Sequence, residues 1–241
     1  MSFYFFCATL VLVSILYSCV GQAGASGYIA TMALFGFAPA TIKPTALVLN
    51  VLVAAVVSFR FYQGGYFSWR LLMPFSVAAM PAALLGGYII LPPVMFNRLL
   101  GTLLLIAAVP FFFRRSASPT VATPPVLVAL LTGAAIGLLS GLTGVGGGIL
   151  ITPLLLYCRW ATPRTSAAVS AVFILINSVA ALLGHLGATT NLPEHLPLFA
   201  LCAITGGMIG SHLGSARLSA TTIFRVLGTI LLGAGGKLIL S

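Results

Sequence analysis

Residues 126–158 read VLVALLTGAAIGLLSGLTGVGGGILITPLLLYC, and the glycines within this run decide the fold. The run contains no charged residue, which is typical of a membrane segment. As one helix it would be roughly 50 Å long, against about 30 Å for the hydrocarbon core of a bilayer. Gly144, Gly146, Gly147 and Gly148 also interrupt helix formation. We therefore predict a helical hairpin with arms over 126–140 and 149–158, whose glycine-rich tip lies near the membrane midplane.

The composition of the whole chain points to lipid as its solvent. Of the 241 residues, 60% are hydrophobic and 5% are charged, whereas a soluble domain carries roughly 25% charged residues. In lipid the backbone must satisfy its own polar groups, so helices and closed barrels are the structures that cross a membrane. The apolar residues form continuous runs and do not alternate with a period of two, which favours helices. We therefore expect an all-α, polytopic membrane protein.

The apolar runs form two sets of five, which suggests an internal duplication. The first set lies at 3–20, 28–38, 45–61, 71–90 and 98–113, and the second at 126–140, 149–158, 166–187, 196–213 and 222–240. The stretch between the sets, 114–125, has the Pro- and Ser-containing composition of a linker. We predict a first transmembrane repeat over 1–113, a cytoplasmic linker over 114–125 and a second transmembrane repeat over 126–241.

Residue matches between the two sets support the duplication. The block RLLGTLLL at 98–105 matches RVLGTILL at 225–232 at six of eight positions. Further positions fall opposite one another at nearly the same spacing: Ser18 and Ser140, Gly24 and Gly146, and Lys43 and Arg164.

The hairpins determine the predicted topology. A hairpin at the start of each half, 3–20 with 28–38 and 126–140 with 149–158, returns the chain to the side that it left. Each half then makes an odd number of crossings, so the two halves are inverted relative to one another. This topology places eight of the eleven Lys and Arg residues on one face, a positive-inside bias, whereas kinked single crossings would split them six against five. We therefore predict that both termini lie outside the cell.

The glycine-rich tips are the predicted substrate site. Transporters built from inverted repeats bind substrate near the midplane, between their repeats. In each tip the missing side chains expose backbone N–H groups, and the following short helix contributes the positive end of its dipole, so the tips favour an anion. The predicted substrate-binding residues are Gln22, Gly24, Ser26, Gly27, Thr143, Gly144, Gly146, Gly147 and Gly148 in the tips, and Thr45, Asn50, Thr165, Ser166 and Asn177 in neighbouring helices.

Each of these residue types also has a structural explanation. Glycines allow helices to pack closely in a membrane. The Thr and Ser residues stand at predicted helix starts, where capping of the helix N-terminus is the alternative role. Asn50 and Asn177 are costly in lipid and are expected to face the bundle interior, where each binds either the substrate or a neighbouring helix.

The sequence lacks the residue sets of enzymes. Glu194 is the one carboxylate side chain, which excludes paired carboxylates and an acidic proton relay within the helices. There is no Walker A motif, and the glycine run is not a dinucleotide fingerprint because no strand precedes it. The four cysteines lack CxxC spacing, so we expect neither a metal site nor disulfides. The basic residues are scattered along the chain, which argues against nucleic acid. We expect no catalytic residue and no cofactor.

The run GLLSGLTGVGGGILITPLLL at 137–156, followed by the pair Thr165-Ser166, resembles the TauE/SafE sulfite exporter family of bacterial membrane permeases. The resemblance covers nearly the whole chain through a weaker copy in the first half, in which GASG at 24–27 replaces the glycine run and Pro44-Thr45 replaces the Thr-Ser pair. It implies export of small sulfur-containing anions such as sulfite or organosulfonates. We therefore expect a multi-pass protein of the bacterial inner membrane, with the periplasmic termini that the charge distribution predicts.

We therefore predict a secondary transporter, an exporter that works by alternating access with its anion bound at the hairpin tips. An anion channel with an open pore is the first alternative, and an intramembrane enzyme is a less favoured one. The expected partners are the small anionic substrate and the lipid bilayer. The sequence is compatible with a homodimer and leaves the oligomeric state open.

Overall fold

The computed structural model describes residues 2–112, 122–185 and 192–216, together with 228–229, 232 and 235–236. Within these residues the chain is helical and contains no strand. Its helices, in chain order, are α1 (Ser2–Ser18), α2 (Ala25–Leu34), α3 (Pro39–Gln63), α4 (Trp69–Tyr88), α5 (Pro93–Phe112), α6 (Val126–Thr143), α7 (Gly148–Tyr157), α8 (Pro163–His185) and α9 (Leu196–Ala216).

These helices match nine of the ten predicted segments, which confirms the all-α fold. Among the described residues, five stretches are long and apolar enough to cross a membrane by length and composition: Ala40–Gln63, Trp69–Tyr88, Val126–Thr143, Pro163–His185 and Leu196–Gly214. The tenth predicted segment, 222–240, and the linker 114–125 lie mostly outside the described residues. The division of the chain into repeats therefore stays a prediction.

The third helix begins earlier than predicted. The hydropathy pattern places this segment at 45–61, whereas α3 begins at Pro39, in the first turn, where proline is favourable. The charge of Lys43 makes the early turns resemble a loop in the hydropathy pattern. Thr45 therefore lies inside the helix, and the prediction that it stands at a helix start is wrong.

The second-half hairpin is confirmed by two contacts along α4. Gly141, near the end of α6, packs against Ala83. After α7, the Trp160 ring lies 6.0 Å from the Phe75 ring, measured between centroids. Phe75 lies two turns before Ala83 on α4, beside Gly133 in the first half of α6. The chain has therefore turned back, and the second arm, α7, has ten residues as predicted.

The first-half hairpin follows the same path along α1. Gly27 of α2 packs against Val13 and Tyr17 in the second half of α1. Beyond the end of α2, the Phe35 ring lies 5.2 Å from the Phe6 ring, near the start of α1. Like α7, α2 has ten residues. Two hairpins with short second arms are thus present at the predicted places.

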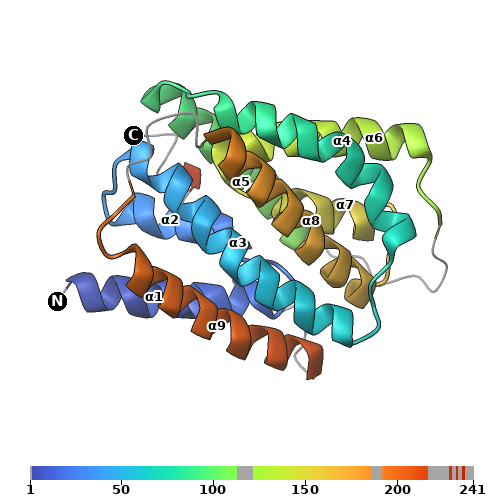
Figure 1. Ribbon diagram of the computed structural model, residues 1–241, viewed down its shortest axis with the longest axis horizontal. Coiled ribbons are helices and arrows are strands. Elements are labelled where there is room, and N and C mark those ends of the chain that lie inside the picture. Colours follow the sequence, from blue (N-terminus) through green and yellow to red (C-terminus); the bar gives the residue numbers. More distant parts are fainter. Residues whose placement is uncertain are drawn as a thin grey trace.

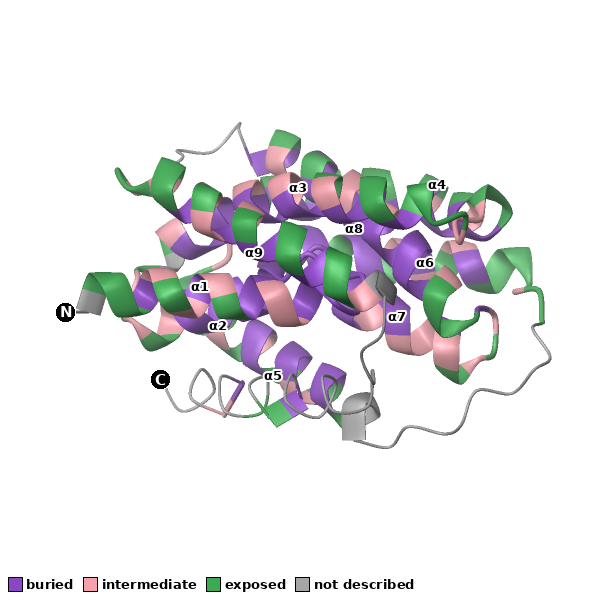
Figure 2. Cartoon of the chain, turned by 90° about the horizontal axis from the view of Figure 1, so that it is seen from below, coloured by how far each residue is buried: buried purple, intermediate pink, exposed green. Residues whose placement is uncertain are grey.

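The hairpins pack around a central pair of helices. Figure 1 shows α3 and α8 running through the middle of the molecule, with α1 beside α9 on one side and α4 beside α6 on the other. Figure 2 shows that buried residues line the inside of this bundle, whereas exposed residues cover the outer faces of α4 and α6. Many of these exposed residues are large and apolar, including Val77, Leu127 and Leu131, as expected for helix faces in contact with lipid.

Glycines at every fourth position hold the two outer helix pairs together. A side chain on any of them would collide with the backbone of the facing helix, so close approach of the two backbones requires glycine. Both pairs run parallel, since successive glycines meet successive turns of the partner. The glycines of α6 that face α4 are Gly133, Gly137 and Gly141, and those of α9 that face α1 are Gly206, Gly210 and Gly214.

Candidate substrate site at the two glycine-rich turns

The turn between α6 and α7 requires glycine for its backbone shape. Gly144 ends α6 with a φ of 81°, and Gly146 and Gly147 follow with φ values of 77° and 79°. This left-handed region strains other residues, and three such positions within four residues reverse the chain. The N-terminus of α7 begins at the end of this turn, so its positive dipole end faces the turn.

Asn50 joins the two glycine-rich turns. Its side-chain oxygen accepts a hydrogen bond of 3.2 Å from the N–H of Ala25, the first residue of α2. Its amide nitrogen donates a hydrogen bond of 2.7 Å to the Ser178 hydroxyl on α8. A side chain at Gly146 would collide with the same amide nitrogen and would lie 3.0 Å from the Ser178 oxygen. The start of α2 and the second-half turn therefore meet on either side of one α3 side chain.

Two buried amides beside these turns have no hydrogen-bond partner. Both polar atoms of Gln22 and both of Asn177 are buried and unpaired. A side-chain carbon at Gly148 would lie 3.9 Å from Gln22 Cγ, and one at Gly147 would lie 3.6 Å from Asn177 Nδ2, so both amides flank the turn. Leaving a buried polar group unpaired costs about 1–3 kcal/mol. The turn is therefore lined by amide donors that are free to bind a polar ligand.

The other predicted tip residues form hydrogen bonds or packing contacts within the two hairpins. The Ser26 hydroxyl donates to the Tyr17 hydroxyl (2.9 Å), and the Thr143 hydroxyl donates to the Leu139 carbonyl (2.6 Å) in its own helix. Gly27 packs against α1 as described above, which matches its structural explanation. Gly24 precedes α2 with a φ of 100°, as the first-half counterpart of the left-handed turn.

The hydroxyl residues of α3 and α8 differ in their surroundings. Thr165 is half-buried at the start of α8, where its N–H donates to the Thr162 hydroxyl, so the residue that caps this helix is Thr162. Ser166 is buried, and its hydroxyl donates to the Thr152 carbonyl of α7 (3.4 Å). The hydroxyl of Thr45 is buried and unpaired. Thr45 and Ser166 therefore lie inside the bundle, whereas Thr165 is only partly covered by it.

Sequence reasoning misses two residues near the site. Ser178 is missed because serine is common in membrane helices, although it directly follows Asn177, so that two polar residues stand next to each other in an apolar run. The predicted topology treats Lys43 as a charge outside the membrane, yet its side chain is buried in α3. Its ammonium group donates to three backbone carbonyl oxygens at the end of α4, those of Gly86 (3.3 Å), Gly87 (3.1 Å) and Ile89 (3.1 Å).

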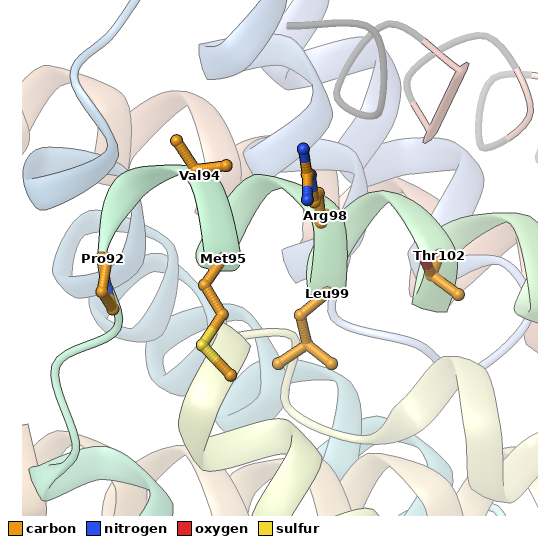
Figure 3. Close-up of a pocket in the computed structure, with 6 residues that line it drawn as sticks. All are labelled: Pro92, Val94, Met95, Arg98, Leu99 and Thr102. Atoms are coloured by element: carbon orange, nitrogen blue, oxygen red, sulfur yellow. The ribbon is translucent and has the colours of Figure 1, made fainter.

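No cluster of three or more His, Cys, Asp or Glu side chains that would suit a metal ion occurs in the described part of the chain. A surface hollow of about 430 Å³ is lined by Pro92 and by five residues of α5. Figure 3 shows these five side chains along a single helix. None of the lining residues belongs to the glycine-rich turns, so this hollow is separate from the site described above.

The family model "Sulfite exporter TauE/SafE" matches residues 6–238. "Probable membrane transporter protein y4hK" of Sinorhizobium fredii is 42% identical over 232 residues, which cover 94% of each chain. "Probable membrane transporter protein YunE" of Bacillus subtilis is 29% identical over 108 residues, covering 43% of this chain and 38% of that protein. No solved structure gives a significant match. Because the family match and the Sinorhizobium relative both span nearly the whole chain, this protein belongs to the TauE/SafE family of membrane transporters.

Proposed function

We propose that this protein is a secondary exporter of small sulfur-containing anions, such as sulfite or organosulfonates, and that the anion binds between the two glycine-rich turns. The observation that carries the proposal is the position of Asn50. This side chain contacts the start of α2, the Gly146 turn and α8 at once, beside the unpaired amides of Gln22 and Asn177. Such a cluster concentrates hydrogen-bond donors at one buried point.

The chemistry of this point favours an anion. Helices α2 and α7 both begin beside Asn50, and the N-terminus of each contributes a positive dipole end and backbone N–H groups. The amide side chains add further donors. The one carboxylate of the sequence, Glu194, lies exposed before α9, so it does not repel an anion bound at the turns. A sulfite or sulfonate group offers three oxygens, which suits several donors converging from different helices.

The helix pairing supports alternating access. Under the predicted repeat, α1 corresponds to α6 and α4 to α9, so the parallel pairs α4–α6 and α1–α9 exchange with one another. α3 and α8, which pack together in the centre, exchange likewise. A molecule whose halves exchange in this way can open first on one face and then on the other, around a site between the repeats.

The test is transport by the purified protein in proteoliposomes. Sulfite, thiosulfate, sulfoacetate and taurine are loaded in turn, and efflux is followed together with counterflow of a labelled substrate. We expect saturable transport and counterflow for at least one sulfur-containing anion. Flux that never saturates and shows no counterflow would identify an open channel instead. If none of the four compounds is transported, while a substrate without sulfur is, the proposed substrate class is wrong.

A further inference from the structure

Lys43 is a buried positive charge with no carboxylate to balance it. It is 6% exposed, and the one acidic side chain of the sequence, Glu194, is exposed in the segment before α9. The three carbonyl oxygens that accept its hydrogen bonds lie at the end of α4, where the helix dipole is negative. Lys43 therefore holds the N-terminal part of α3 against the C-terminal end of α4. We call these three hydrogen bonds the Lys43 latch.

The latch adjoins the proposed anion site. The stem of Lys43 passes the turn at Gly144, where a side chain would lie 3.3 Å from Lys43 Cγ. Along α3, Lys43 precedes Asn50 by two helical turns, which is about 10 Å and returns to the same face of the helix. An extended lysine side chain reaches about 6 Å, so a rotation of Lys43 along this face would bring its ammonium group close to an anion held beside Asn50.

The residue that corresponds to Lys43 in the second half is placed differently. Arg164 lies near the start of α8, as Lys43 lies near the start of α3, and it is exposed. Its guanidinium donates to the Tyr66 hydroxyl (2.7 Å) and lies 5.1 Å above the ring centroid of the same tyrosine. One cation is therefore inserted into the bundle while its counterpart is at the surface, which is the asymmetry expected when one face is closed and the other is not.

From these contacts we propose that Lys43 is a charged gate residue, which rests on the proposed function of anion export. In the structure it holds closed the face at which α4 ends. When an anion occupies the glycine-rich turns, its charge attracts the ammonium group more strongly than neutral carbonyls do. Lys43 then leaves the end of α4, α3 and α4 separate there, and the anion is released on that face. The substrate itself thus opens the gate.

The gate is tested by chemical labelling in a background without the four native cysteines. Leu47 is fully buried one helical turn after Lys43, between Lys43 and Asn50, and Leu47→Cys serves as the reporter. A membrane-impermeant maleimide is applied to each face of sealed vesicles. Lys43→Gln is compared with Arg98→Gln, because Arg98 is an exposed cation on a different helix, α5.

We expect Lys43→Gln to raise the labelling rate from one face about tenfold or more, because it removes the charged donor that holds α3 against the end of α4. Arg98→Gln should leave the rate unchanged. Sulfoacetate, which unlike sulfite does not add to maleimides, should accelerate labelling when Lys43 is present and have no effect in Lys43→Gln. Transport should fall about tenfold or more in Lys43→Gln and recover partly in Lys43→Arg, which also controls for folding.

Equal labelling rates in Lys43→Gln and Arg98→Gln would overturn the proposal that Lys43 is a gate residue. The comparison without sulfite tests the latch even if the protein transports no sulfur-containing anion, so the two proposals fail separately.

Discussion

The Asn50 amide donates a 2.7 Å hydrogen bond to the Ser178 hydroxyl, and this contact links the two halves of the chain next to Gly146. Asn50 also accepts the N–H of Ala25, so one side chain sets the relative positions of α2, α3 and α8. A residue in this position has both a structural role and, under our proposal, a role in binding the anion. Substitutions of different chemistry separate these two roles.

Asn50→Asp separates charge from structure. The carboxylate keeps an acceptor for the Ala25 N–H and for the Ser178 hydroxyl, so we expect normal membrane insertion and a thermal unfolding temperature close to that of the wild type. A negative charge at the site repels an anion, so transport should fall at least about tenfold. The matched control is Ser178→Ala, which removes one partner without adding charge and should lose less activity. Equal transport by Asn50→Asp and the wild type would show that the anion binds elsewhere.

Gly146→Ala tests whether the second-half turn must stay free of side chains. The methyl group would collide with the Asn50 amide, so we expect transport to be lost while insertion is retained. Gly65→Ala is the control, because Gly65 has a similar φ of 72° with no atom within 4 Å of an added carbon. Both variants carry the same backbone strain, about 1 kcal/mol. The difference in transport between them therefore measures the effect of crowding at the turn.

Gln22→Leu and Asn177→Leu test whether the unpaired amides are retained for binding. Replacing a buried, unpaired polar group by an apolar one of similar size is neutral or stabilising. We expect each variant to unfold at the same or a higher temperature in detergent and to lose transport about tenfold or more. Ser76→Ala removes a buried, unpaired hydroxyl of α4, next to Phe75, which packs against Gly133 in the first half of α6, and this variant should keep full activity. Active leucine variants would contradict a binding role for these amides.

The predicted topology is tested with reporter tags. Tags at residue 1 and residue 241 should both report the periplasm, and a tag within 114–125 should report the cytoplasm, because this orientation gives the positive-inside distribution of Lys and Arg. The measurement is the activity of paired alkaline phosphatase and fluorescent protein fusions. A cytoplasmic tag at residue 241 would contradict the inverted arrangement of the two halves.

Membrane voltage should drive the export. Each negative charge that leaves a cell gains about 2.3 kcal/mol per 100 mV of membrane potential, and no carboxylate is present within the helices to carry protons inward. In proteoliposomes clamped with potassium and valinomycin, we expect efflux to rise as the substrate side becomes more negative. The double variant His185→Ala, His212→Ala should keep this response. Efflux that ignores voltage and follows a pH gradient would instead assign proton coupling to these histidines.

Local chemistry in the sequence determines the all-helical fold and the two hairpins. Charged residues are almost absent, so the chain lies in lipid and its backbone must form helices. In each half, clustered glycines end the first helix at the point where the hairpin turns back. These effects act over a few residues and can be read directly. The burial of Asn50 and Asn177 is likewise predictable, because an amide on an apolar helix is costly in contact with lipid.

The tertiary structure alone decides which side chains meet. The pairing of Asn50 with Ser178 joins residues 128 positions apart and depends on how α3 crosses α8. The start of α3 at Pro39 is hidden in the sequence by the charge of Lys43, and that charge is tolerated inside the bundle because the end of α4 supplies three carbonyl oxygens. Contacts of this kind depend on helix packing across the whole molecule, whereas hydropathy and glycine spacing report only the neighbourhood of each residue.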